Sequence, residues 1–501
     1  MDEMNEINRY IIGIDQSTQG TKALIFDGQG RILGRSDLAH DQIVNELGWV
    51  EHNPEQIYSN TLQAARMVIE KTGIDKSRIA AIGLTNQRET AVVWDRESGR
   101  AVYNAIVWQC ARGASICKGI EEHADMIQSR TGLNLSPYFS AAKIAWVLEE
   151  VEGARERSRA GKLAYGTMDS WLIYRLTGNQ SYKTDYSNAS RTQLFNIRTL
   201  QWDEEICGLF GINPEGLAKV CDSNANFGET DLGGYLERPI PIHSAIGDSH
   251  GALFGQNCWK EGMVKATYGT GSSIMMNIGT KPIFSSRGIV TSLAWGISGK
   301  VSYVLEGNIN YTGAVISWLK DDLGLIKSAA ETEELAKRAN AADRTYLVPA
   351  FSGLGAPYWN SGAAAVLCGM TRRTGKAEIV KAALESIAYQ ITDIVKVMSR
   401  EAGIKITQLR ADGGPTRNGY LMQFQSDMLD ISVRVPETEE LSVIGAAYMA
   451  GIGLGMYRSE QLSLENNAKL YQPEGRLQDR QERYEGWKTA VAMVLNQYPS
   501  K

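Results

Sequence analysis

Two short turns rich in glycine and hydroxyl side chains separate apolar stretches of the chain. The first covers residues 15–22, DQSTQGTK, and the second covers residues 267–273, TYGTGSS. Hydroxyl groups and exposed backbone N–H groups in such turns can bind phosphate oxygens, and Lys22 adds positive charge to the first turn. Asp15 offers a carboxylate for Mg²⁺, which uses few carboxylates and keeps several waters. Neither turn is a Walker loop, because the pattern GxxxxGK[ST] is absent.

A third stretch of the same kind occurs late in the chain. Asp412-Gly413-Gly414 follows an apolar stretch and precedes a helix-like segment. A bare hairpin explains either hydroxyl-rich turn equally well when the turn is considered alone. The three stretches together favour a nucleotide held between two domains.

Asp248 is the acidic residue whose surroundings most need an explanation. It lies in SAIGDSHGALFGQ, residues 244–256, after an apolar strand-like stretch and before small residues. Gly-Asp-Ser is ordinary turn composition, so Asp248 is either a turn residue or a catalytic carboxylate. His250 is close by in the sequence but has no evident partner. The local sequence leaves both interpretations of Asp248 open.

The composition is that of a globular protein with more than one domain. The chain has 501 residues, 43% hydrophobic and 22% charged, which is too long for one core and indicates two or more domains. A net charge of −5 gives no electrostatic reason to expect a nucleic-acid partner. We expect no membrane span, because no apolar run approaches about 18 residues.

Cysteine usage and the first residues favour a cytoplasmic protein. The six cysteines show no CxxC pattern and no neighbouring histidine cluster, which is typical of reduced thiols rather than disulfides or a zinc site. The first ten residues are acidic and polar, so no signal peptide is expected.

Strand-like and helix-like segments alternate, which predicts an α/β fold. Asn53 is expected to cap a helix that Gly73 ends, with Gln56 completing a capping box. The predicted strands cover residues 10–14, 22–26, 79–84 and 406–411, and a long helix covers 379–398 and ends at Gly403. A strand, acidic residue and hairpin occur early, and the stretches 244–255 and 264–279 repeat that theme. We therefore place the domains at residues 1–253 and 254–501.

Longer blocks resemble the FGGY family of carbohydrate kinases, and glycerol kinases within it. The resemblance runs from about residue 10 to 454. Its most specific blocks are GWVEH, IAAIGLTNQRET, YNAIVWQC, TDYSNASRTQLFNI, VPAFSGLGAPYW and LESIAYQ, and both family signatures are present, at residues 138–150 and 369–385. It implies two ribonuclease H-like domains of the actin/hexokinase type with a cleft between them. Substrate and phosphate binding would fall to the first domain and nucleotide binding to the second.

The resemblance also implies roles for individual residues. Asp248 matches the general base that takes the proton of the attacking hydroxyl. The substrate-binding set would be Arg88, Glu89, Trp108, Tyr138, Asp248 and Ser249. The nucleotide-binding set would be Thr18, Gln19, Lys22, Gly269, Thr270, Gly313, Ser317, Gly414 and Asn418. Asp15 would hold the metal.

Several site positions depart from the usual glycerol kinase pattern. Ser17 and Lys22 stand where glycerol kinases have Gly and Arg. Ser249 and Ser317 each replace Gln, and Ser273 replaces a Phe that walls the substrate. Pro415-Thr416-Arg417 replaces small residues. Losing the Phe wall and a Gln would open the substrate pocket.

These observations lead to one expected function and two alternatives. The expected reaction is transfer of phosphate from ATP, with Mg²⁺, to a terminal hydroxyl of glycerol, giving glycerol 3-phosphate. The first alternative substrate is a larger polyol or a ketose, such as a tetritol, a pentitol or a xylulose-type sugar. The second alternative, an actin- or Hsp70-like ATPase, is disfavoured by the substrate residues. Family analogy alone suggests a homo-oligomer.

Overall fold

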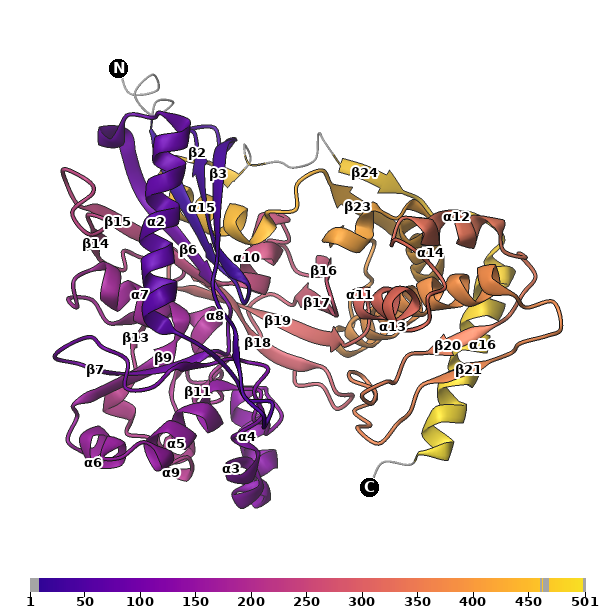
Figure 1. Cartoon of the computed structure of the whole chain (residues 1–501), viewed down its shortest axis with the longest axis horizontal. Coiled ribbons are helices and arrows are strands. Elements are labelled where there is room, and N and C mark those ends of the chain that lie inside the picture. The colour runs from indigo at the N-terminus through magenta and orange to yellow at the C-terminus, as the bar shows by residue number, and fades with distance from the viewer. Residues whose placement is uncertain (1–8, 460–461, 463–467, 499–501) are drawn as a thin grey trace.

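The chain folds into two halves, each built on a mixed β-sheet (Figure 1). This computed structural model describes residues 9–459, 462 and 468–498. The first sheet has the strand order β14-β15-β6-β1-β2-β3, with bounds Glu229–Thr230, Ile240–Gly247, Ile79–Asn86, Tyr10–Gln16, Gly20–Phe26 and Ile32–Ala39. The second has the order β18-β19-β17-β16-β22-β23-β24, with bounds Val290–Ile297, Lys300–Ile309, Ser272–Asn277, Val264–Tyr268, Gln408–Asp412, Ser432–Pro436 and Ala468–Tyr471.

The two sheets repeat one topology. β1 pairs with β2 antiparallel and with β6 parallel, and β16 pairs in the same way with β17 and β22. β15 then extends the first sheet beside β6, as β23 extends the second beside β22. The repeat therefore equates β1–β2 with β16–β17. The stretch 244–255, which the sequence pattern grouped with the second hairpin, instead begins in β15 and belongs to the first sheet.

Helix α2, Pro54–Thr72, covers the first sheet and begins and ends where the sequence predicts. The Asn53 side chain accepts hydrogen bonds from the backbone N–H groups of Glu55 and Gln56, and Gly73 ends the helix in the left-handed region. The expected capping box is wrong. The Gln56 side chain instead accepts from the Asp41 backbone N–H (3.0 Å) and donates to the Asp41 carboxylate (3.0 Å), a partner that local sequence does not reveal.

A smaller sheet and short helices extend the first half and carry part of the candidate site. The sheet has the order β4-β5-β8-β7-β9, with bounds Ile43–Val44, Val50–His52, Ala105–Ile106, Ala91–Asp95 and Leu163–Thr167. The helices are α3 (Ala114–Gly119), α4 (Ala124–Thr131), α5 (Ser140–Glu150), α6 (Ala154–Arg159), α7 (Met168–Leu176), α8 (Tyr186–Ala189) and α9 (Glu204–Leu209). Trp108 follows β8, and Tyr138 precedes α5.

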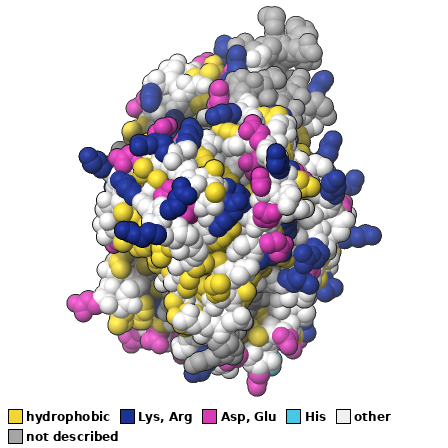
Figure 2. Space-filling view, turned by 90° about the vertical axis from the view of Figure 1, so that its right-hand side faces the viewer, with side chains coloured by type: hydrophobic (Ala, Val, Ile, Leu, Met, Phe, Trp, Pro, Cys, Tyr) yellow, Lys and Arg dark blue, Asp and Glu magenta, His cyan; other side chains and the backbone are white. Residues whose placement is uncertain are grey.

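The second half is covered by longer helices. α13, Lys376–Ala402, is mostly buried and ends at Gly403 (φ 67°), as its apolar spacing predicts. α11 (Gly313–Ser317), α12 (Glu331–Arg338), α14 (Gly419–Leu429) and α16 (Leu477–Gln497) surround it. On the face of this half seen in Figure 2, basic and acidic side chains are interspersed. Within the described ranges, no helix combines the length and apolarity needed to cross a membrane.

Helix α15, Leu441–Gly453, lies in the chain between β23 and β24 of the second sheet but packs on the first sheet. It lies against α10, Asp248–Gly255, and its Val443 and Ala447 share a buried cluster with Phe26 of β2. The α10 and α15 backbones touch, because a Cβ added at Gly445 would lie 1.9 Å from the Gly251 carbonyl oxygen. The position of α10, and of Asp248 at its start, therefore depends on α15.

We expect Gly445→Ala to destabilise the protein by about 1–3 kcal/mol, because the added methyl group must push two helices apart. Thermal unfolding measures the loss, and turnover should fall as α10 moves. Gly208→Ala in α9 is the matched control, since nothing lies within 4 Å of a Cβ added there. Equal melting temperatures for the two variants would contradict the close helix contact.

Candidate active site

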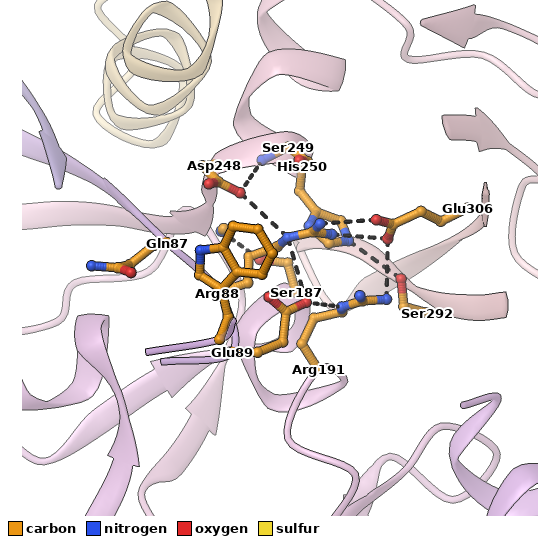
Figure 3. A network of polar contacts seen from close by, with 12 residues as sticks. Gln87, Arg88, Glu89, Ser187, Arg191, Asp248, Ser249, His250, Ser292 and Glu306 are labelled. Carbon is orange, nitrogen blue, oxygen red and sulfur yellow. Dashed lines mark hydrogen bonds and ion pairs between the residues drawn. The ribbon is translucent and has the colours of Figure 1, made fainter. Parts of the chain in front are cut away.

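Arg88 lies at the centre of a buried network of charged side chains (Figure 3). It occupies the loop between β6 and β7. Its Nη1 and Nη2 donate to the two carboxylate oxygens of Glu306 in β19, each at 2.8 Å. Its Nε lies 3.3 Å from Asp248 Oδ1 and 3.8 Å from Glu89 Oε1. The network thus joins the first half of the molecule to the second.

Arg191, just after α8, completes this network. Its Nε donates to Glu89 Oε1 (2.6 Å), and its Nη1 lies 3.1 Å from Glu306 Oε2. Burial alone would raise the pKa of Glu306, but Arg191 and Arg88 reverse the effect and hold that pKa well below its usual value. Both carboxylates that bind these arginines are almost fully buried. Buried carboxylates therefore hold both arginines in place.

Asp248 lies at the first turn of α10, directly after β15. Its Oδ1 accepts a hydrogen bond from the Ser249 backbone N–H (2.6 Å), and its side chain is 35% exposed. Within the described part of the chain, Oδ2 accepts no hydrogen bond. The surrounding protein partly desolvates the carboxylate and so raises the pKa of Asp248, although Arg88 opposes the shift. A partly open carboxylate with a raised pKa is suited to accept a proton.

Trp108 and Tyr138 form an aromatic wall beside this network. Their rings meet edge to face with centroids 5.6 Å apart. The buried Lys143 of α5 fixes the segment around Tyr138, because its Nζ donates to the carbonyls of Pro137 (2.8 Å), Tyr138 and Phe139 (3.1 Å). Burial lowers the pKa of Lys143 to about 7. Trp108 Nε1 also donates to Thr18 Oγ1 (2.9 Å), which connects the wall to the first hydroxyl-rich turn.

The first turn links β1 to β2 and holds Asp15, Thr18 and Gln19 together. Asp15 Oδ1 is buried without a hydrogen-bond partner. Burial raises the pKa of Asp15 to about 7, and the charge of Asp248 adds to the shift. The Lys22 side chain is turned to Glu440, with Nζ 3.1 Å from Oε2. Lys22 would have to leave this partner to reach a phosphate.

Asp15 fits a magnesium ion that is bound mainly by phosphate and water. No group of three or more His, Cys, Asp or Glu side chains arranged for a metal occurs among the residues that the structure describes. Mg²⁺ in phosphoryl-transfer sites needs only one or two carboxylates, so one unpartnered buried carboxylate oxygen beside the first hydroxyl-rich turn is sufficient.

The second turn, between β16 and β17, lies against the start of α11. Gly269 and Thr270 are exposed, and their carbonyls accept from the N–H groups of Gly313 (2.9 Å) and Ala314 (3.0 Å). Ser317 is exposed at the end of the same helix. Gly269, Thr270 and Gly313, three residues of the nucleotide-binding set that the resemblance implies, therefore lie together.

The third stretch lies beside this turn. Gly413 has φ 97°, and a Cβ there would lie 2.0 Å from the Tyr268 carbonyl oxygen, so Gly414 is held next to the second turn. Asn418 caps α14, because its Oδ1 accepts from the Leu421 N–H (2.9 Å), while its Nδ2 donates to Thr332 Oγ1 (3.0 Å). Both ends of the Asn418 side chain thus have partners within the protein.

Sequence reasoning missed three residues of the network. Arg191 lies in the block TDYSNASRTQLFNI, for which the resemblance implied no role for any single residue. Glu306 directly follows the apolar strand stretch Tyr303–Leu305, and an acidic residue within such a strand is the signal that could have found it. His250 is buried beside Arg88, with its Nε2 3.4 Å from Ser292 Oγ. Burial and the charge of Arg88 hold its pKa well below the usual value, so it is neutral.

Comparison with known proteins places this site in a family. The family model "FGGY family of carbohydrate kinases, N-terminal domain" matches residues 10–255, and the C-terminal domain model matches residues 264–454. The chain belongs to the FGGY family of carbohydrate kinases. The resemblance found in the sequence and the two-domain α/β fold are therefore confirmed.

Relatives within the FGGY family cover the whole chain. Glycerol kinase 1 of Thermotoga maritima is 49% identical over 97% of this chain and 100% of its own length. The glycerol kinase of Bacillus licheniformis is 44% identical over 97% and 99%. The crystal structure of Plasmodium falciparum glycerol kinase with ADP superimposes with a TM-score of 0.91, at 35% identity and with coverage of 97% and 98%. A xylulose kinase from Lactobacillus acidophilus shares the fold, with a TM-score of 0.88 at 21% identity over 98% and 99%.

Proposed function

We propose that this FGGY kinase transfers the terminal phosphate of ATP to a terminal hydroxyl of glycerol, giving glycerol 3-phosphate and ADP. The observation that carries the proposal is the partly open Asp248 carboxylate beside Arg88 and Glu89, next to the aromatic wall. Similarity over nearly the full length to glycerol kinases of 43–49% identity supports glycerol as the acceptor.

In this proposal the side chains divide the work of phosphoryl transfer. Arg88 donates to one acceptor hydroxyl and Glu89 accepts from the next, while Trp108 and Tyr138 cover the carbon chain. Asp248 takes the proton of the terminal acceptor hydroxyl while the oxygen of that hydroxyl bonds to the γ-phosphorus of ATP. The bond between the γ-phosphorus and the oxygen that bridges it to the β-phosphorus breaks, which releases ADP. Mg²⁺, held by Asp15 and the phosphates, would neutralise the charge of the transferring group.

We propose that nucleotide binding uses both hydroxyl-rich turns. Thr18, Gln19 and Lys22 belong to the turn of the first half. The turn of the second half contributes Gly269 and Thr270, with Gly313, Ser317, Gly414 and Asn418 beside it. Gly269 and Thr270 are exposed, and they lie in the hairpin turn that the repeated topology equates with the turn after Asp15, which supports this arrangement.

The remaining expectations stay proposals. A division near residues 253 and 254 is supported by the gap between the two family-model matches, although α15 returns to the first sheet. A cytoplasmic location agrees with six cysteines that form no disulfide. A homo-oligomer rests on family analogy.

Ser273 is the residue on which acceptor size most depends. It lies in β17 opposite Asn308 of β19, and its Oγ is buried without a hydrogen-bond partner. We expect Ser273→Phe to raise the preference for glycerol over a pentitol by roughly tenfold, because added bulk fills space that only the longer acceptor uses. The ratio of kcat/KM for the two acceptors measures the effect. An unchanged ratio would show that Ser273 does not line the acceptor pocket. Ser292→Ala, a change beside His250, is the control variant and should leave the ratio unchanged.

An acceptor panel tests the proposed substrate. Initial rates with ATP and Mg²⁺ would be compared for glycerol, a tetritol, a pentitol and D-xylulose. Glycerol should show the highest kcat/KM. A higher value for a longer polyol or the ketose would move the substrate to the first alternative, and ATP turnover independent of any acceptor would favour an ATPase.

A further inference from the structure

We infer that Glu306 is a positioning residue for the acceptor site: by binding both Nη groups of Arg88, it sets which edge of that guanidinium faces Asp248 and the acceptor. The inference rests on the proposed function, since it concerns the same site. Glu306 is fully buried and comes from β19 of the second sheet, whereas Arg88 and Asp248 belong to the first half (Figure 3).

Each oxygen of the Glu306 carboxylate faces two side-chain nitrogen atoms. Oε1 accepts from Arg88 Nη2 (2.8 Å) and Asn308 Nδ2 (3.2 Å). Oε2 accepts from Arg88 Nη1 (2.8 Å) and faces Arg191 Nη1 at 3.1 Å. A carboxylate that accepts three hydrogen bonds and also faces the Arg191 guanidinium cannot rotate without losing several of these contacts, so it fixes the plane of the Arg88 guanidinium.

The bidentate pair determines what remains of Arg88 for the reaction. With both Nη groups turned to Glu306, the Nε edge faces Asp248 Oδ1 at 3.3 Å and Glu89 Oε1 at 3.8 Å. A guanidinium without another partner commonly binds a carboxylate through two parallel hydrogen bonds. Without Glu306, the carboxylates within reach of Arg88 are Asp248 and Glu89. Glu89 is already bound by Arg191 Nε (2.6 Å), so we expect Arg88 to pair with Asp248 and to occupy both oxygens of the proposed base.

The charges around Asp248 favour the same conclusion. Arg88, Glu89 and Lys265 all act on its carboxylate, and Asp15 is close enough to interact with it. Glu306 neutralises Arg88 from the side opposite Asp248. Glu306 therefore allows the Arg88 guanidinium to lie beside Asp248, where it can donate to an acceptor hydroxyl, without forming a bidentate pair with the Asp248 carboxylate.

The test is Glu306→Gln, which keeps the shape of the side chain and removes its charge. Asp393→Asn is the matched control. Asp393 is a buried carboxylate of α13, away from the site, that accepts from Tyr358 (2.9 Å), Tyr484 (2.6 Å) and Trp487 (2.7 Å). Both variants should melt at lower temperature than the native protein, because each leaves buried donors without their charged partner.

Michaelis constants separate positioning from a merely structural role. We expect Glu306→Gln to raise the glycerol KM about tenfold and to lower kcat at least about tenfold, with the ATP KM nearly unchanged, because only the acceptor side is misplaced. Asp393→Asn should leave both Michaelis constants and kcat unchanged. An unchanged glycerol KM in folded Glu306→Gln would overturn the inference, whatever the change in kcat.

Two further measurements keep the result interpretable. Glu306→Asp retains the charge with a shorter reach, so its glycerol KM should lie between those of the native protein and Glu306→Gln; it carries the test alone if the Gln variant does not fold. The native protein is assayed in parallel on the acceptor panel. If it uses another acceptor, the proposed substrate is wrong, and the same comparison of KM on that acceptor still decides the role of Glu306.

Discussion

Asp248→Asn should lower kcat by about 10²–10⁴-fold, the usual contribution of a positioned general base, and should change the Michaelis constants little. Asn keeps the size of the side chain, and its amide oxygen can still accept the hydrogen bond from the Ser249 backbone N–H, so the fold should be intact. It cannot take the proton of the attacking hydroxyl. The loss should therefore be confined to the chemical step.

The control for this variant is Asp203→Asn, an acidic residue that caps α9 by accepting from the Ile206 N–H (3.2 Å). Its kcat should equal that of the native protein. Steady-state assays of both variants, with circular dichroism to establish folding, make the comparison. Near-native turnover of Asp248→Asn would exclude Asp248 as the base.

Asp15→Asn should lower turnover by orders of magnitude and weaken its dependence on Mg²⁺ concentration. The Asp15 carboxylate has a buried oxygen without a partner beside the turn proposed to bind phosphate. An amide is a poorer magnesium ligand and carries no charge to balance the ion. Titration of activity with Mg²⁺ measures the effect, and an unchanged titration would remove the metal assignment.

The pH dependence of stability gives a second readout for Asp15 that needs no turnover. Burial raises the pKa of Asp15 from its ordinary value of 3.8 to about 7, so the folded protein holds a proton that the unfolded chain has lost. The contribution of Asp15 to stability therefore falls as pH rises through this range. Without Mg²⁺, the melting temperature of Asp15→Asn relative to the native protein should rise as pH rises from about 4 to about 7, and should level off above that pH. A difference that is constant with pH would contradict the shift.

Local sequence predicted the elements whose signals are local. The caps at Asn53 and Gly73, the β1–β2 hairpin and the end of the long helix at Gly403 all depend on residues within a few positions. The capping box at Gln56 failed because Asp41, 15 residues earlier, competes for the side chain. The residues alone pointed to the two hydroxyl-rich turns and to Asp15 as a metal ligand, whereas the substrate-binding residues and the choice of Asp248 as the base came from the family resemblance.

What the sequence could not reveal are contacts between distant segments. Arg88 and Glu306 are 218 positions apart, and nothing near either residue indicates the other. The return of α15 to the first sheet depends on a fit between Gly445 and Gly251 that no periodicity predicts. The same holds for Lys22, whose pairing with Glu440 turns it away from the site that its turn suggested.

Proton-coupled phosphorus-31 NMR of the protein with ATP, Mg²⁺ and glycerol tests the central claim most directly. The account predicts that the ATP signals give way to those of ADP and to a phosphate monoester that appears as a triplet, because phosphate on a terminal hydroxyl couples to the two protons of one CH₂ group. Without an acceptor the ATP signals should persist. A doublet from the secondary position, release of inorganic phosphate, or no reaction with glycerol would contradict the account.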